Sequence, residues 1–295
     1  MSKQRRIGQF SVSGIGLGGM PFSLGGDRLT HHEQGIATVH AALDAGITLI
    51  DTADIYAPAW DQMGHNERIV AEGIRTWTGD ASNVVVATKG GITRHEGNTW
   101  GRDSSPDYLR AAAHRSRDRL GVERIDLYYL HRPDRTRLYA DAIEVLAGLR
   151  ADGVISEIGI SNANVEEVRI ALDVLGEGGL AAVQNEFSPK FNHTSYPELL
   201  FCGERGIAFV PWSPLGGVGG GHDVGDRFPV LAEVADAHGV SPQVVTLAWE
   251  LSLGDHVVPI PGASRPASIT DSAKALDLEL TPEELERISA TLLQR

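Results

Sequence analysis

The chain has 295 residues, enough for one large domain, and its 42% hydrophobic and 22% charged residues are typical of a globular protein. A formal net charge of −13 argues against the basic surface that binding to nucleic acid or to an anionic membrane would need. No apolar run approaches the roughly 18 residues of a membrane span, and the basic start MSKQRRIGQF lacks the apolar stretch of a signal peptide, so we expect a cytoplasmic protein.

Short β-branched runs alternate with amphipathic stretches along the chain, after a small hairpin predicted at Arg6–Gly14. Several of the runs are apolar throughout, which is typical of parallel strands buried on both faces. The predicted strands are Ile15–Leu17, Thr48–Asp51, Val84–Lys89, Ile125–Leu130, Ser156–Ser161, Ala182–Asn185, Ile207–Pro211 and Val257–Ile260.

Helices are predicted between these strands, the first with a capping box formed by Thr30 and Glu33. A further helix is expected at Thr281–Arg295, which begins Thr-Pro-Glu-Glu, whereas the glycine-rich stretch Leu215–Gly225 is interpreted as a mobile loop. The predicted helices are Thr30–Ala45, Asn66–Trp77, Ser105–Leu120, Asp141–Ala151, Asn164–Leu175, Pro197–Gly206, Pro229–His238 and Pro242–Leu253.

Strict alternation of strand and helix favours a closed (β/α)₈ barrel over an open sheet, with an N-terminal hairpin and extra C-terminal helices. No linker, repeat or low-complexity block divides the chain, so residues 1–295 are expected to form one domain. The series Gly14-x-Gly16-x-Gly18-Gly19 is not interpreted as a dinucleotide fingerprint, because Pro21 and further loop residues follow it where a helix would have to begin.

Ionisable side chains gather at the ends of consecutive predicted strands. Asp51 ends the second strand, Lys89 the third, and His131 follows the fourth, while Tyr56 lies in the loop that Asp51 opens. Each alone has an ordinary structural explanation, such as a solvated lysine or a hydrogen-bonded core histidine. In a barrel, however, the carboxyl ends of the strands meet at one face, and that face carries the chemistry.

Together these four side chains would form a proton-donor set. A phenol with a pKa near 10 is protonated at neutral pH and can donate. We expect the Lys89 ammonium to lower the pKa of Tyr56 and Asp51 to hold Lys89 by an ion pair. A neutral His131 would orient a carbonyl oxygen by a hydrogen bond, so that the set lacks only a source of hydride.

A series of motifs resembles the aldo-keto reductase family, in family order across nearly the whole chain. The motifs are DTADIY (Asp51–Tyr56), the pair Asn66-Glu67, Lys89-Gly90, LHRPD (Leu130–Asp134), GISN (Gly159–Asn162), PWSPLGG (Pro211–Gly217) and IPGASRP (Ile260–Pro266). The resemblance implies that Asp51, Tyr56, Lys89 and His131 are the catalytic tetrad, and that a nicotinamide cofactor lies extended across the barrel mouth.

The resemblance also implies which residues hold the cofactor. Polar groups at strand ends would hold the carboxamide, Trp212 would stack on the nicotinamide unless it is an ordinary core residue, and backbone groups of the glycine-rich segment would approach the pyrophosphate. The residues in these roles are Ser161, Asn162, Gln184, Trp212, Ser213, Leu215 and Gly217.

The segment that begins at Gly262 would receive the adenosine 2′-phosphate through Ser264 and Arg265, which favours NADPH; a solvated arginine in an ordinary turn is the alternative. Two departures from the family pattern keep NADH possible. Ser268 replaces a frequent arginine, and Asp271 and Ser272 replace a Glu-Asn pair that usually contacts adenine.

The substrate is expected to be a small carbonyl compound or the corresponding alcohol. Trp60 and Trp100 are candidate walls of the substrate site or merely pack the loops, and the polar, basic loop Gly91–Ser104 beside them leans toward sugar-like carbonyls. No metal is expected, because the histidines show no ligand spacing, and the single cysteine, Cys202, is expected in the core. Two alternatives to a carbonyl reductase remain. One is an NADP(H)-binding sensor subunit with little turnover, and the other is an unrelated barrel enzyme such as a lyase or hydrolase.

Overall fold

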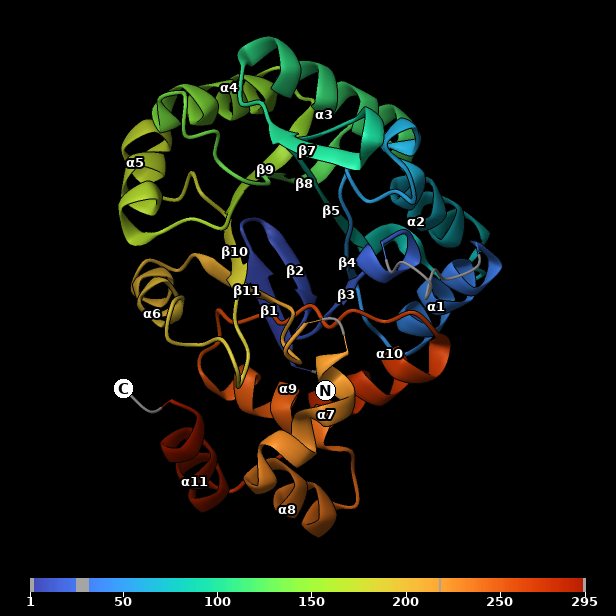
Figure 1. The fold of residues 1–295 in the computed structure, drawn as a ribbon, viewed down its shortest axis with the longest axis vertical. Coiled ribbons are helices and arrows are strands. Elements are labelled where there is room, and N and C mark those ends of the chain that lie inside the picture. The colour runs from blue at the N-terminus through green and yellow to red at the C-terminus, as the bar shows by residue number, and fades with distance from the viewer. Residues whose placement is uncertain (1–2, 25–31, 218, 294–295) are drawn as a thin grey trace.

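The computed structural model describes residues 3–24, 32–217 and 219–293. Seven parallel strands form its central sheet, in the order β11-β10-β9-β8-β5-β4-β3, with helices around the outside (Figure 1). The α/β barrel predicted from the alternating pattern is therefore confirmed. The strands are β3 (Gly16–Gly18), β4 (Leu49–Asp51), β5 (Val85–Gly90), β8 (Ile125–Leu130), β9 (Ile155–Ser161), β10 (Ala182–Glu186) and β11 (Ala208–Trp212).

The segment Val257–Ile260, predicted as the eighth strand, closes the barrel but forms only isolated parallel bridges with its neighbours. On one side Val258 and Ile260 donate to carbonyls of β11, at 2.9 and 3.1 Å. On the other side the carbonyls of Pro259 and Pro261 accept from β3, both at 3.0 Å. Because a proline has no N–H, these two positions cannot complete the ladder with β3, and a continuous strand does not form.

Helices cover the outer face of the sheet and mostly match the predicted ranges. The capping box predicted at Thr30 lies outside the described residues, while that of the last helix is present, with Thr281 and Glu284 as partners. The helices are α1 (His32–Asp44), α2 (His65–Thr76), α3 (Pro106–Leu120), α4 (Tyr139–Ala151), α5 (Val165–Leu175), α6 (Tyr196–Glu204), α7 (Gly220–Arg227), α8 (Pro229–His238), α9 (Pro242–Ser252), α10 (Pro266–Ala273) and α11 (Pro282–Leu292).

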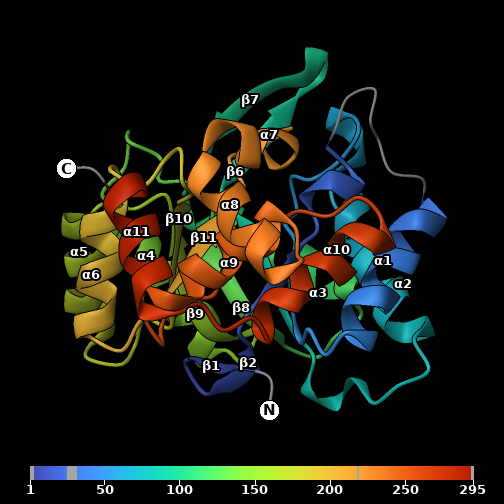
Figure 2. The same ribbon diagram turned by 90° about the horizontal axis from the view of Figure 1, so that it is seen from below.

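Two predicted loops contain regular structure instead. Helix α7 occupies the second half of Leu215–Gly225, which was expected to be a mobile loop, and it packs against α8 and α9. The loop Gly91–Ser104 is an antiparallel hairpin of β6 (Ile92–His95) and β7 (Thr99–Arg102). Both elements lie at the same end of the barrel (Figure 2).

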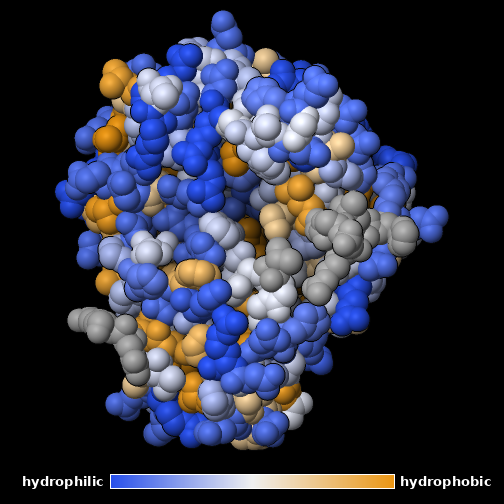
Figure 3. All heavy atoms as spheres, viewed as in Figure 1, coloured by the Kyte–Doolittle hydropathy of each residue, from blue (hydrophilic) through white to orange (hydrophobic). Residues whose placement is uncertain are grey.

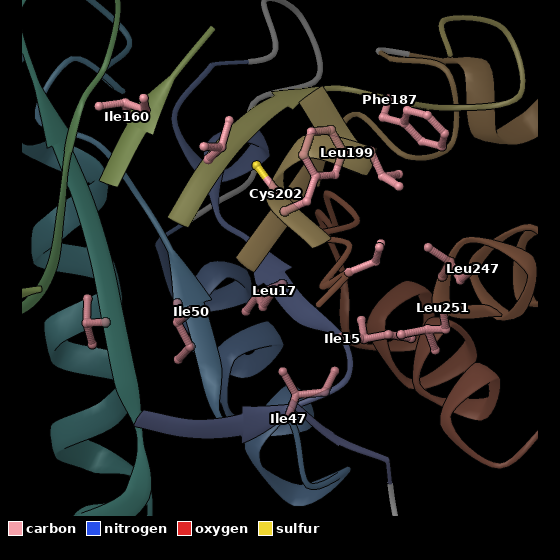
Figure 4. Packing of buried hydrophobic residues seen from close by; sticks show 14 of the residues in the cluster. Ile15, Leu17, Ile47, Ile50, Ile160, Phe187, Leu199, Cys202, Leu247 and Leu251 are labelled. Carbon is pink, nitrogen blue, oxygen red and sulfur yellow. The ribbon is translucent and has the colours of Figure 1, made fainter. Parts of the chain in front are cut away.

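The side chains of each strand alternate between two apolar layers. The layer between sheet and helices contains residues such as Leu17, Ile50 and Ile160, packed against residues of the surrounding helices such as Leu247 and Leu251 (Figure 4). Cys202 lies buried in this outer layer, as expected for a small core residue. The inner layer fills the barrel, and Ile7 and Val12 of the hairpin β1 (Gln4–Ile7) and β2 (Phe10–Ser13) belong to it.

The β1–β2 hairpin lies at the end of the barrel opposite β6–β7 and α7 (Figure 2). Its apolar side chains extend the inner core, so this end of the barrel is packed shut. No helix of the described chain is long and apolar enough to cross a membrane. A site within the barrel can therefore open only at the end where the parallel strands have their carboxyl termini.

Candidate active site

The alternation of side chains carries the predicted site residues to the barrel mouth. On β5, Val85 and Ala87 belong to the inner core, and Lys89 is the next residue of the same parity. His131 follows Leu127 and Tyr129 of β8 in the same way. The other strand-end candidates, Asp51, Ser161, Gln184 and Trp212, also have inward parity on their strands.

Lys89 is fully buried and binds two oxygens at the carboxyl end of β4. Its Nζ lies 2.5 Å from Oδ1 of Asp51 and 2.8 Å from the carbonyl oxygen of Thr52. The other carboxylate oxygen of Asp51 accepts from Nε2 of Gln184 at 2.8 Å, across the inside of the barrel. The expected ion pair between Asp51 and Lys89 is thus formed, and an amide holds it from the far side.

Tyr56 and His131 meet above this ion pair. Their rings are in edge contact, with centroids 5.8 Å apart, and Nζ of Lys89 lies 5.2 Å from the centroid of the Tyr56 ring. The loop that carries Tyr56 is fixed on both sides, because Asp54 N donates to the carbonyl of Lys89 and Asn66 N donates to the carbonyl of Tyr56, each at 3.2 Å. Nδ1 of His131 is buried and has no hydrogen-bond partner within the described residues.

Burial dominates the electrostatics of the four groups. It raises the pKa of Tyr56 above its usual value, and the opposing charge of Lys89 only reduces this shift. Lys89 lowers the pKa of Tyr56 as expected, but desolvation of the phenolate is the larger effect, so the net pKa is raised rather than lowered. Burial, with Lys89 adding to it, depresses the pKa of His131 well below its usual range.

The other two groups keep their charges as a pair. Burial raises the pKa of Asp51, opposed by the charge of Lys89 and by the hydrogen bonds from Lys89 and Gln184. For Lys89, desolvation is the largest single effect and lowers its pKa, but the charges of Asp51 and Tyr56 and the hydrogen bonds to them together leave that pKa raised. At neutral pH the site then contains a protonated phenol, a neutral imidazole and a buried ammonium–carboxylate pair. This is a set that can donate a proton to an oxygen and then stabilise the phenolate left behind.

These side chains lie at the base of a cavity of about 680 Å³ that opens on the face shown in Figure 3, which is hollowed near its centre. Asp51, Tyr56 and His131 line it, whereas Lys89 lies behind them. All residues that the sequence assigned to a cofactor also line this one cavity: Ser161, Asn162, Gln184, Trp212, Ser213, Leu215, Gly217, Gly262, Ser264, Arg265, Ser268, Asp271 and Ser272.

The polar residues at the ends of β9 and β10 are already held in place. Asn162 has a φ of 59° and donates from Nδ2 to Ser161 Oγ at 2.8 Å and to the His131 carbonyl at 3.2 Å. Gln184 donates to Asp51 and also hydrogen-bonds Tyr129, so its side chain is held by two neighbours inside the barrel. The amides are thus pre-organised, because their orientation does not depend on what enters the cavity.

The side of the cavity formed by β11 and α10 carries groups suited to an anionic ligand. Nε1 of Trp212 is buried without a hydrogen-bond partner among the described residues. After it, Ser213 and Gly217 have left-handed φ angles of 53° and 86°, so the backbone turns sharply along the wall. Arg265, directly before α10, is held by a 3.2 Å hydrogen bond from its Nε to Oγ of Ser268.

Asp271 of α10 is engaged by its own neighbours. Its carboxylate accepts hydrogen bonds from Oγ of Ser241 at 2.5 Å and from Nζ of Lys274 at 2.8 Å. Ser272, the next residue of α10, is buried. These contacts turn most of the acceptor capacity of Asp271 away from a ligand.

The two tryptophans proposed as substrate walls have different positions. Trp100 of β7 lines the cavity, and the guanidinium of Arg94 lies 4.7 Å from its ring centroid. Trp60 is 40% exposed, lies outside the cavity lining, and its backbone N–H binds Oδ1 of Asn98 at 3.1 Å. Only Trp100 is therefore placed to contact a substrate in this conformation.

Sequence reasoning missed several residues of the lining. Arg132 follows His131 directly, and His222 and Gln243 come from α7 and α9. Arg132 could have been found as the residue beside a predicted catalytic histidine, and Gln243 lies at the start of a helix that was predicted. His222 lies on α7, which the pattern did not predict. Within the described residues no group of three or more His, Cys, Asp or Glu side chains has the geometry of a metal site.

The fold and site together define an α/β barrel protein with a buried acid–base centre at the carboxyl ends of its strands. The family model of the aldo/keto reductase family matches residues 14–292. The chain belongs to this family of NAD(P)H-dependent oxidoreductases.

Individual relatives agree with this assignment. A 6-dehydroglucose reductase of Novosphingobium aromaticivorans is 35% identical over 81% of this chain and 79% of its own length. An uncharacterized oxidoreductase of Schizosaccharomyces pombe is 30% identical over 96% of this chain and 88% of its own length. An aldo/keto reductase of Klebsiella pneumoniae, solved with NADP and acetate, superimposes with a TM-score of 0.79 and 26% identity, over 99% of this chain and 96% of that one.

Proposed function

We propose that this protein reduces an aldehyde or ketone to an alcohol with NADPH, with Tyr56 as the general acid. The observation that carries the proposal is the position of Tyr56 beside His131 and over the buried ammonium of Lys89, at the base of a cavity large enough for a cofactor and a substrate. The relative solved with NADP supports the choice of cofactor. The family relationship supports a small carbonyl compound as substrate.

The residues present fit a nicotinamide dinucleotide. The unpartnered Nε1 of Trp212 is a donor on the cavity wall, and Arg265 supplies a guanidinium at the far end, where a phosphate is best recognised. Ser161, Asn162 and Gln184 line the same cavity and carry the hydroxyl and amide groups that suit a carboxamide. When bound, the cofactor supplies the hydride that adds to the carbonyl carbon.

The protein's own residues then handle the proton. His131, neutral because burial depresses its pKa, orients the carbonyl oxygen toward Tyr56. The phenol, whose raised pKa keeps it protonated, transfers its proton to that oxygen as negative charge develops there. The Lys89 ammonium stabilises the phenolate that remains, and Asp51 holds Lys89 in place through the transfer. Carbonyl, hydride and proton together balance to the alcohol.

The test separates binding from chemistry. Trp100 and Trp212 line the cavity, so quenching of tryptophan fluorescence reports NADPH binding. Tyr56→Phe keeps the ring and removes only the hydroxyl. We expect its Kd for NADPH to stay within about twofold, while kcat for 4-nitrobenzaldehyde falls about 10²- to 10⁴-fold.

Tyr196→Phe is the matched control, because Tyr196 begins α6 outside the cavity lining and should leave kcat unchanged. Turnover of Tyr56→Phe close to wild type would exclude Tyr56 as the acid. Tight NADPH binding by the wild-type protein without turnover of any carbonyl would instead favour a sensor subunit. Absence of binding of either NADPH or NADH would overturn the proposal altogether.

A further inference from the structure

Arg132 is a cation on the cavity wall that the proposed chemistry does not use. It directly follows His131 at the end of β8, is half-buried, and lines the same cavity as Tyr56 and Trp100. Within the described residues its guanidinium makes no hydrogen bond and no ion pair within 4.0 Å. A guanidinium has five N–H donors. Because Arg132 is half-buried and its donors have no protein partner, binding of a ligand acceptor would compensate for the water that its guanidinium has lost.

No carboxylate of the described residues forms an ion pair with this arginine. Burial is the main cause that lowers the pKa of Arg132, and the charge of Arg102 lowers it further. Glu186 and Tyr56 act in the opposite direction, but the Glu186 carboxylate forms no salt bridge with Arg132. Arg132 therefore has a second arginine and one carboxylate near it, and neither pairs with it directly.

Arg132 also lies on the side of the cavity away from the residues that suit a cofactor phosphate. Those residues follow β11 or precede α10, whereas Arg132 follows β8 beneath the β6–β7 hairpin. The hairpin is fastened to this loop, because Arg102 Nη1 donates to the Pro133 carbonyl at 3.3 Å and Asp134 N donates to Ser104 Oγ at 3.2 Å. Arg132 and Trp100 are thus held on the substrate side of Tyr56 and His131.

We propose that Arg132 binds a carboxylate of the substrate, so that the protein prefers aldehydes or ketones that also carry an anionic group. This rests on the proposed carbonyl reductase function and names its substrate class. The guanidinium would hold the carboxylate through paired N–H donors while the carbonyl oxygen lies between Tyr56 and His131. Trp100 would cover the carbon chain between the two groups.

The kinetic test uses two substrate pairs that differ only in charge. They are 4-oxobutanoate with its methyl ester, and 4-carboxybenzaldehyde with its methyl ester. The measured quantity is the ratio of kcat/KM for the acid to kcat/KM for the ester, with NADPH saturating. We expect Arg132→Gln to lower this ratio about 10- to 100-fold, the range for loss of a charge-assisted hydrogen-bonded pair, and Arg132→Lys to recover part of it.

Arg75→Gln is the matched control. It removes the same charge from α2, where Arg75 is exposed and only loosely paired with Glu72 at 3.8 Å, and both ratio and activity should match wild type. An unchanged ratio in Arg132→Gln, with a cooperative thermal melt showing that it folds, would overturn the assignment. A rise in the KM for NADPH in place of the change in ratio would also overturn it, since Arg132 would then serve the cofactor.

A binding measurement tests the carboxylate site at Arg132 independently of catalytic turnover. Benzoate and methyl benzoate are titrated against the wild type and Arg132→Gln, with quenching of tryptophan fluorescence as the readout. Benzoate should bind the wild type more tightly, and this preference should be lost in the variant. If the wild type turns over no aldehyde, the reductase proposal fails, while equal binding of benzoate by both proteins refutes the carboxylate site.

Discussion

The Asp51–Lys89 pair offers a quantitative test of how the site is built. Both side chains are almost completely buried, 4% and 0% exposed, and Nζ reaches Asp51 at 2.5 Å and the Thr52 carbonyl at 2.8 Å. Lys89→Met keeps the chain length and removes the charge. It leaves a buried carboxylate with only Gln184 as partner, which should cost about 3–5 kcal/mol of the free energy of unfolding.

The same substitution raises the pKa of Asp51 further, because burial already raises it and only Lys89 and Gln184 oppose that shift. Asp51→Asn should therefore compensate part of the loss. The double variant should be more stable than the sum of the two single changes predicts, by about 1–3 kcal/mol.

Equilibrium urea unfolding of the four proteins in this cycle at pH 7 measures both quantities. Arg110→Met is the control, since its 3.0 Å pair with Asp152 is exposed, 44% and 61%, and should contribute less than about 1 kcal/mol. A cost below about 1 kcal/mol for Lys89→Met, or strict additivity in the cycle, would refute the claim that the pair is energetically coupled in a low-dielectric site.

The remaining predictions test the cofactor, the core and the pH response. Arg265→Ala should raise KM for NADPH at least several-fold more than KM for NADH; equal effects would mean that Arg265 does not contact the 2′-phosphate. Gly159→Ala should lower the free energy of unfolding by about 1–3 kcal/mol, because a Cβ there overlaps the Tyr129 ring. Adding Tyr129→Leu to this variant should restore stability. No change in the free energy of unfolding of Gly159→Ala would contradict the described packing. The depressed pKa of His131 means that below about pH 6.5 the unfolded chain binds a proton that the folded chain does not. His131 therefore contributes a loss of stability of up to about 1.4 kcal/mol per pH unit as the pH falls, and His131→Gln should remove that contribution from the urea data between pH 7 and 5.

Much of the fold was predictable because each strand of a parallel barrel is buried on both faces. The apolar runs therefore marked β5, β8 and β9 within a few residues, and the turn residues after them marked the loops. The closing segment was recognised by its composition, but Pro259 and Pro261 prevent a full ladder with β3. The composition of this segment therefore predicted its position in the barrel correctly, but not that it lacks a continuous hydrogen-bonded ladder with β3.

Helix α7 was missed because local propensity argues against it. Its sequence GGHDVGDR contains three glycines, each of which disfavours helix by about 1 kcal/mol relative to alanine. The helix forms because α8 and α9 pack against it and because the Gln243 side chain binds the carbonyl of Gly221. These contacts come from later in the chain, and a local pattern cannot reveal them.

The β6–β7 hairpin had a signal that was overlooked. Gly97 and Asn98 both have left-handed φ angles, 76° and 55°, which is the chemistry of a tight hairpin turn. Arg94 and Trp100 are paired in register across the two strands, with the guanidinium over the indole ring. A polar loop with Gly-Asn between β-branched residues therefore predicts a hairpin, and this one shapes the substrate side of the cavity.

The candidate site was predictable strand by strand, but its assembly depends on register. Asp51 lies level with Ala87, so Lys89 extends two residues beyond it on the next strand. Lys89 in turn lies level with Tyr129, and His131 extends two residues further. This stagger is the shear of a closed barrel, in which the strands tilt against the axis. Because Asp51 and Gln184 then meet across the barrel although 133 residues separate them, the position of the proton donor depends on closure of the whole sheet.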